Sequence, residues 1–76
     1  MELQDFIEKF ASQLETTDVS ELTADTEFKA LSEWSSLMAL SIIALVDEEY
    51  GVAIKGNDIR EAETIEDLYN IVESRK

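Results

Sequence analysis

An apolar run that begins at Ser36 and reaches Tyr50 constrains the fold of this chain more than any other stretch. Drawn as a helix, it has one arc of apolar and aromatic side chains, which is predicted to face the core. This arc consists of Ala39, Ile42, Ile43, Val46 and Tyr50. Gly51 follows directly, and glycine readily adopts the left-handed conformation that ends a helix. We therefore predict a central helix over residues 36–50.

The opposite arc of the same helix should face solvent, yet it also carries large apolar side chains. It holds Leu37, Leu40, Ser41, Ala44 and Glu48, with Met38 and Leu45 on its flank. Exposed apolar patches rimmed by polar groups tend to be contact sites. These seven residues are therefore predicted to bind a partner protein. The alternative interpretation is a central helix that is buried nearly all round.

Two further segments have helical periodicity. In residues 2–14 apolar side chains recur every three or four positions. They are Leu3, Phe6, Ile7, Phe10, Ala11 and Leu14. The same spacing after Ile65 predicts a final helix to about Ser74, opened by Thr64 and Asp67 as a loose capping box. Before it, Asn57 or Asp58 is predicted to cap a brief helix through about residue 62.

Residues 15–35 show no periodicity and are rich in Thr, Ser, Asp and Glu. We interpret them as a long loop pinned to the core by Phe28 and Leu31. A short helical turn within it is compatible with the sequence, which does not indicate its position. The prediction is an all-α, small four-helix bundle with three principal helices, one short third helix and a long loop between helices one and two. A chain of 76 residues has room for one core. We therefore expect a single domain over residues 1–76.

The composition excludes most catalytic chemistry. Without cysteine or histidine, the chain lacks disulfides, thiolate metal ligands and the commonest general base. The run Asp47-Glu48-Glu49 points around the helix in different directions and lacks the spacing of a calcium-binding loop. We therefore predict no enzyme activity, no catalytic residue and no dedicated metal site.

The formal net charge of -12 repels phosphate backbones and anionic membranes. Nucleic acid and membrane are therefore not expected as partners. The charge either steers the chain toward proteins with basic patches or simply confers solubility. No run resembles a signal peptide or is long enough to span a bilayer, so we expect a cytoplasmic monomer.

The serine pair at the start of the central helix allows two roles. Ser35 or Ser36 can act as the N-cap by accepting a hydrogen bond from an amide of the first turn. One cap needs only one serine. A second hydroxyl at a helix N-terminus lies where free amides and the positive end of the dipole would stabilise a phosphate.

The run Trp34-Ser35-Ser36-Leu37 opens a helix that closes with an acidic run, Tyr50 and the short connector Val52-Ala53-Ile54. This pattern resembles the acyl carrier protein family, whose typical motif is Asp-Ser-Leu, and the likeness extends over nearly the whole chain. The resemblance implies that Ser36 carries 4'-phosphopantetheine, installed from coenzyme A by a phosphopantetheinyl transferase. It also implies an acyl or aminoacyl cargo held as a thioester, with loading and acyl-transfer enzymes as partners.

Two departures from the family pattern point to a specialised carrier. Ser35 stands where the family usually has Asp, which implies slower modification or a dedicated transferase. Met38 and Ser41 replace positions that are often acidic, so partner contact is expected to be more apolar. By resemblance, five apolar residues either line a cleft between helices that accepts an acyl chain or form ordinary core. These are Ile42, Ile43, Val46, Ile54 and Ile65. The rival hypothesis is an unmodified, carrier-like interaction module that works through the exposed apolar face.

Overall fold

The computed structural model describes residues 2–15 and 17–76, and within them it contains helices and no strand. The α-helices are α1 (Leu3–Ala11), α2 (Ser36–Tyr50), α3 (Gly56–Glu61) and α4 (Ile65–Ser74). Two single-turn 3-10 helices, η1 (Val19–Glu21) and η2 (Phe28–Ala30), lie in the connection between α1 and α2. The predicted all-α class, with three longer helices and a short third one, is confirmed.

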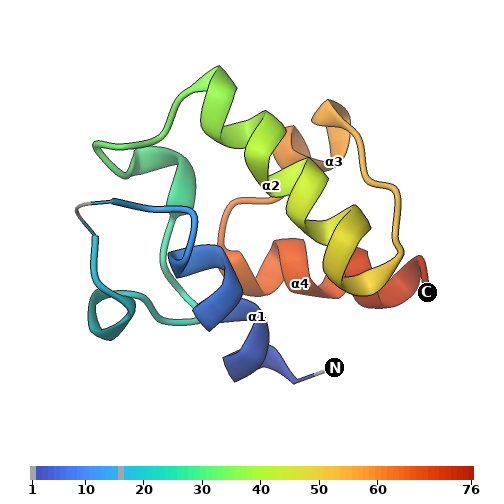
Figure 1. Cartoon of the computed structure of the whole chain (residues 1–76), viewed down its shortest axis with the longest axis horizontal. Helices are drawn as coiled ribbons and strands as arrows, with labels where there is room; N and C mark the ends of the chain where they lie inside the picture. The colour runs from blue at the N-terminus through green and yellow to red at the C-terminus, as the bar shows by residue number, and fades with distance from the viewer. Residues whose placement is uncertain (1, 16) are drawn as a thin grey trace.

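The helices surround one hydrophobic core. In Figure 1, α2 runs diagonally across the molecule, with α4 beneath it and α1 at the lower left. Helix α1 contacts α4, and α3 contacts both α2 and α4. The largest of the almost completely buried side chains come from α1, η2, α2 and α4. They are Phe6, Phe10, Phe28, Ile42, Val46, Ile65, Leu68 and Val72. Ile54 is also buried in this core, and Ile43 packs against it.

Helix α1 ends at Ala11, three residues before the predicted end at position 14. The hydroxyl of Ser12 donates to the carbonyl oxygen of Lys9, so it competes with the helical backbone pattern. The amide of Leu14 then bonds the carbonyl of Ala11, three residues back, at 2.9 Å. This tighter turn returns Leu14 to the core, where it is buried. The apolar pattern thus predicted the burial of Leu14 correctly and its helical conformation wrongly.

The long connection between α1 and α2 is pinned by aromatic side chains. Phe28 is completely buried and makes edge-to-face contacts with Phe10 at 5.6 Å and with Trp34 at 5.0 Å between ring centroids. Leu31 packs against the same core. The predicted pinning by Phe28 and Leu31 is confirmed. The two 3-10 turns are additions to the predicted loop.

Helix α2 has the predicted bounds of residues 36 and 50. Gly51 follows in the left-handed conformation, with φ 66° and ψ 26°, and its amide donates to the carbonyl of Asp47 at 3.0 Å. Side chains other than glycine rarely adopt this conformation, so Gly51 fixes the end of the helix.

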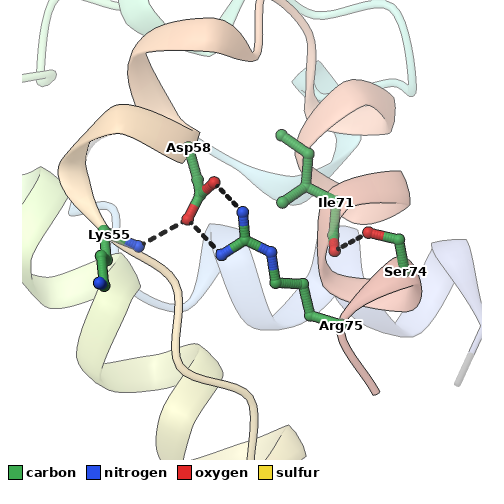
Figure 2. Close-up of polar contacts among 5 residues, drawn as sticks. All are labelled: Lys55, Asp58, Ile71, Ser74 and Arg75. Atoms are coloured by element: carbon green, nitrogen blue, oxygen red, sulfur yellow. Dashed lines mark hydrogen bonds and ion pairs between the residues drawn. The ribbon is translucent and has the colours of Figure 1, made fainter.

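The N-cap of α3 lies two or three residues before the predicted one, because neither Asn57 nor Asp58 is the cap. The N-cap is Lys55, whose amide donates to the carboxylate of Asp58 at 2.8 Å. Asp58 is buried and also accepts two hydrogen bonds from the Arg75 guanidinium, at 2.8 and 2.5 Å (Figure 2). The Lys55 amide and Arg75 lower the pKa of Asp58, whereas burial acts in the opposite direction. Asp58 therefore ties the start of α3 to the end of α4.

Helix α4 opens with the predicted capping box. The hydroxyl of Thr64 accepts the amide of Asp67 at 3.1 Å, and the Asp67 carboxylate accepts the amide of Thr64 at 3.1 Å. The helix ends at Ser74, as predicted. No helix in the described part of the chain is long and apolar enough to cross a membrane.

Candidate functional site

The two serines at the start of α2 have different surroundings. Ser35 is the N-cap: its backbone is extended, and its hydroxyl oxygen accepts the amide of Met38 at 3.2 Å. The carbonyl of Ser35 accepts the amide of Ala39 at 3.0 Å, which begins the helical ladder. The capping role that the sequence left open between the two serines therefore belongs to Ser35.

Ser36 is the first residue of α2 and is exposed. Within residues 2–15 and 17–76, its hydroxyl has no hydrogen-bond partner, and the backbone amides of Ser36 and Leu37 have no acceptor. The first turn of α2 contains no acidic side chain. Two free amides, the positive end of the helix dipole and a free hydroxyl thus lie together, an arrangement suited to a phosphate ester.

The two residues that precede the serine pair are anchored to distant parts of the chain. The carboxylate of Glu33 accepts the amides of Glu15 at 2.6 Å and of Thr17 at 2.7 Å. Trp34 stacks on Phe10 of α1 with an angle of 6° between the ring planes. Glu33 and Trp34 therefore attach the segment before Ser36 to α1 and to the loop that follows it.

The exposed apolar face predicted on α2 exists, and Leu37 and Leu40 are its main exposed members. Their exposed fractions are 74% and 63%, which are high for leucine in a folded chain. Ala44 and Glu48 are exposed as well. Met38 and Ser41 are half-buried, and the Ser41 hydroxyl donates to the carbonyl of Leu37 at 3.2 Å. The interpretation of α2 as a helix buried nearly all round is therefore wrong.

Leu45 does not belong to the exposed face, because its side chain is only 8% exposed. It lies in the wall of a groove between α1 and α2 that Lys9 and Ser12 also line. Lys9 forms an ion pair with Glu49 at 3.1 Å, and this hydrogen bond raises the pKa of the lysine. The Leu45 side chain belongs to the hydrophobic core, so the prediction that Leu45 lies on the flank of the exposed face is wrong.

A model of the phosphopantetheine attachment site family matches residues 4–72, nearly the whole chain. The chain belongs to this family. The resemblance found in the sequence is thereby confirmed at the level of the family. No curated protein and no solved structure matches the chain.

Membership of the phosphopantetheine attachment family fixes the class of function. Domains of this family carry 4'-phosphopantetheine on a serine and are themselves non-catalytic. They interact in general with phosphopantetheinyl transferases and with enzymes that load the carrier. The start of α2 fits the group, because the Ser36 hydroxyl and two amides have no partner among the residues that the structure describes, and the first turn has no acidic side chain that would repel the phosphate.

Sequence reasoning missed the role of Glu33, which had no assigned function. Its partners are backbone amides 16 and 18 residues away, and an amide has no residue-specific signal in a sequence.

No group of three acidic side chains in the described residues is arranged to hold a metal ion.

Proposed function

We propose that Ser36 is the attachment point for 4'-phosphopantetheine and that the chain carries an acyl or aminoacyl group between enzymes of a specialised biosynthetic pathway in the cytoplasm. One observation supports Ser36 above Ser35: the Ser35 hydroxyl holds an amide of α2, whereas the Ser36 hydroxyl is exposed and has no partner within the described residues. This chain has no cysteine and therefore no thiol of its own. The prosthetic group supplies the thiol that holds the cargo as a thioester.

A dedicated transferase is part of this proposal. The family usually has Asp at the position of Ser35, where an acid is expected to help the magnesium-dependent transfer. The nearest acid before Ser36 in the sequence is Glu33, and both of its carboxylate oxygens already accept backbone amides. Glu33 is therefore a poor substitute for the missing Asp. The transferase that recognises this carrier must supply more of the metal site itself.

Recognition by partner enzymes is assigned to the exposed apolar face of α2. Leu37 follows Ser36 directly, Leu40 lies about one helical turn further along α2, and both side chains are largely exposed to solvent. Burying an exposed leucine contributes roughly 1.5–3 kcal/mol, so two of them suffice to favour an apolar partner surface. The surrounding acidic surface would speed encounters with basic partners. We include the exposed Ala44 and Glu48 and the half-buried Met38 and Ser41 in this contact surface.

The test is a transfer assay with coenzyme A and a broad-specificity phosphopantetheinyl transferase, read by intact mass. The wild-type chain is expected to gain one phosphopantetheine group, Ser36→Ala none, and Ser35→Ala one, because Ser35 serves as the cap. Circular dichroism checks that both variants keep the fold. Modification of Ser36→Ala would contradict the assignment. So would a folded Ser35→Ala variant that is not modified while Ser36→Ala is.

The exposure of Leu37 and Leu40 also favours a second candidate function, an unmodified module that binds partners through this face alone. The two functions differ in what the variants do. In the unmodified module, Ser36→Ala leaves partner function intact and Leu40→Glu abolishes it. In the carrier, Ser36→Ala abolishes cargo transfer while partner binding through Leu40 persists.

A further inference from the structure

Glu33 connects two parts of the molecule that are far apart in sequence. One carboxylate oxygen accepts the amide of Glu15 at 2.6 Å, and the other accepts the amide of Thr17 at 2.7 Å. Hydrogen bonds from amides to a carboxylate are short and roughly twice as strong as those between neutral groups. The half-buried Glu33 therefore holds the loop that follows α1 against the segment that leads into α2.

Trp34 adds a second anchor directly after the first. Its ring stacks on Phe10 of α1 and meets the edge of Phe28. Ser35 then holds the first turn of α2 through the amide of Met38. Three consecutive side chains thus fix the backbone that enters Ser36. Trp34 belongs to the aromatic core and Ser35 is the cap, so Glu33 is the contact whose loss frees the segment without removing core or cap.

We propose that Glu33 is a positioning residue for the modification of Ser36, and this inference rests on the proposed function. Through its two amide bonds, Glu33 holds the 33–35 segment so that the Ser36 hydroxyl is presented in one orientation. In the transfer, the Ser36 oxygen forms a bond to the pantetheine phosphorus of coenzyme A, and the P–O bond to the adenosine portion breaks. Adenosine bisphosphate leaves, and the hydroxyl proton passes to a base of the transferase. The reaction rate depends on the orientation of the attacking oxygen, which Glu33 helps to set.

The variant that tests this inference is Glu33→Gln, which keeps the shape of the side chain. An amide group has one acceptor oxygen, so it can satisfy only one of the two backbone amides. We expect kcat for phosphopantetheine transfer to fall roughly three- to tenfold, because the reacting hydroxyl is less well oriented. The KM for the carrier should stay within about twofold, because the apolar face of α2 is unchanged.

Two further variants separate geometry from charge. Glu27→Gln removes the same single charge as Glu33→Gln and lies in the same connection between α1 and α2. Its side chain is exposed and makes no hydrogen bond within the described residues, so this variant should keep the wild-type rate. Glu33→Asp keeps the charge but is one methylene too short to reach both amides, so it should be slow like Glu33→Gln. Amide hydrogen exchange of Glu15 and Thr17 should accelerate in both Glu33 variants, and this measurement requires no modification.

Equal kcat values for the wild type and Glu33→Gln would overturn the inference, even if the melting temperature falls, because that result shows a purely structural role. Glu33→Asp at the wild-type rate beside a slow Glu33→Gln would also overturn it, because charge and not the pair of hydrogen bonds would then be responsible. A wild-type chain that takes no phosphopantetheine would overturn the proposed function itself. A modified wild type with unaffected Glu33 variants overturns only the role of Glu33.

Discussion

Helices α2 and α4 begin with the same kind of N-cap, but they differ in whether the backbone amides of the first turn have hydrogen-bond acceptors. Each has a hydroxyl residue as N-cap, Ser35 in α2 and Thr64 in α4, whose side chain accepts an amide three residues on. In α4 every amide of the first turn has an acceptor. In α2 two of them have none within the described residues.

The first turn of α4 is closed by the rest of the fold. The Asp67 carboxylate accepts the amides of Glu63 and Thr64, each at 3.1 Å. The amides of Ile65 and Glu66 donate to carbonyl oxygens of the α1–α2 connection, at 3.1 and 3.0 Å. Ile65 itself is completely buried. This helix start serves stability, and no group is left there for a ligand.

The first turn of α2 is open by contrast. It lacks an acidic side chain, and the amides of the exposed Ser36 and Leu37 have no acceptor in the described part of the chain. Free helix-terminal amides are normally satisfied by caps, water or ligands. The fold thus supplies acceptors for all first-turn amides of α4, but not for those of Ser36 and Leu37 within the described residues. We take this as support for attachment at that residue.

The largest expected difference between the two helix starts is in stability. Thr64→Ala should lower the free energy of unfolding by about 1–2 kcal/mol, because it removes half of the reciprocal capping box between Thr64 and Asp67. Ser35→Ala should cost less, about 0.5–1 kcal/mol, because its single 3.2 Å bond lies in an exposed turn. Urea denaturation at one pH and salt concentration measures both. A larger loss for Ser35→Ala would break the comparison.

A smaller effect is expected when an acid is added to the open turn. Leu37→Glu should raise the free energy of unfolding by about 0.3–1 kcal/mol at low salt, because the glutamate complements the positive end of the helix dipole. Leu40→Glu is the matched control, with the same charge change on an exposed leucine beyond the first turn. Thermal melts at low and high salt should show the gain for Leu37→Glu only, and only at low salt. Equal behaviour of the two variants would contradict the dipole explanation.

The smallest effect is local and depends on pH. The amides of Glu63 and Thr64 lower the pKa of Asp67 below its ordinary value of 3.8. The ionised carboxylate thus stabilises α4 above about pH 4, and this contribution is lost as the pH falls through the lower pKa of the folded state. In an NMR titration, the two amide resonances should move with a midpoint below 3.8. The Met38 amide, bonded to a serine hydroxyl, should not follow them, and a parallel shift would contradict this.

The features predicted correctly from sequence are those set by neighbouring residues. The bounds of α2 follow from a serine cap and a terminal glycine, and the capping box of α4 lies within four residues. The prediction of an exposed apolar face on α2 was largely correct, because helical periodicity is also set by residues close in sequence. The exposure of Leu45 was predicted wrongly, because a helical wheel shows which way a side chain points but not what packs against that side.

The features missed from sequence depend on partners far along the chain. The sequence predicts Asn57 or Asp58 as a local cap, but the guanidinium partner of Asp58, Arg75, lies 17 residues away beyond α4. Glu33 binds two backbone amides of a loop, and no pattern of residue types indicates such a contact. Periodicity therefore predicted the helices, whereas the contacts that fix their ends and connections required the three-dimensional structure.

The most direct test of attachment at Ser36 is to purify the protein from its native host and locate any added group by fragment-ion mass spectrometry. The expected result is one phosphopantetheine group, with or without cargo, on a fragment that contains Ser36, while Ser35 and Ser41 are unmodified. A chain that is fully unmodified in its host, or a group on Ser35, would contradict the assignment of the open turn of α2 as the attachment site.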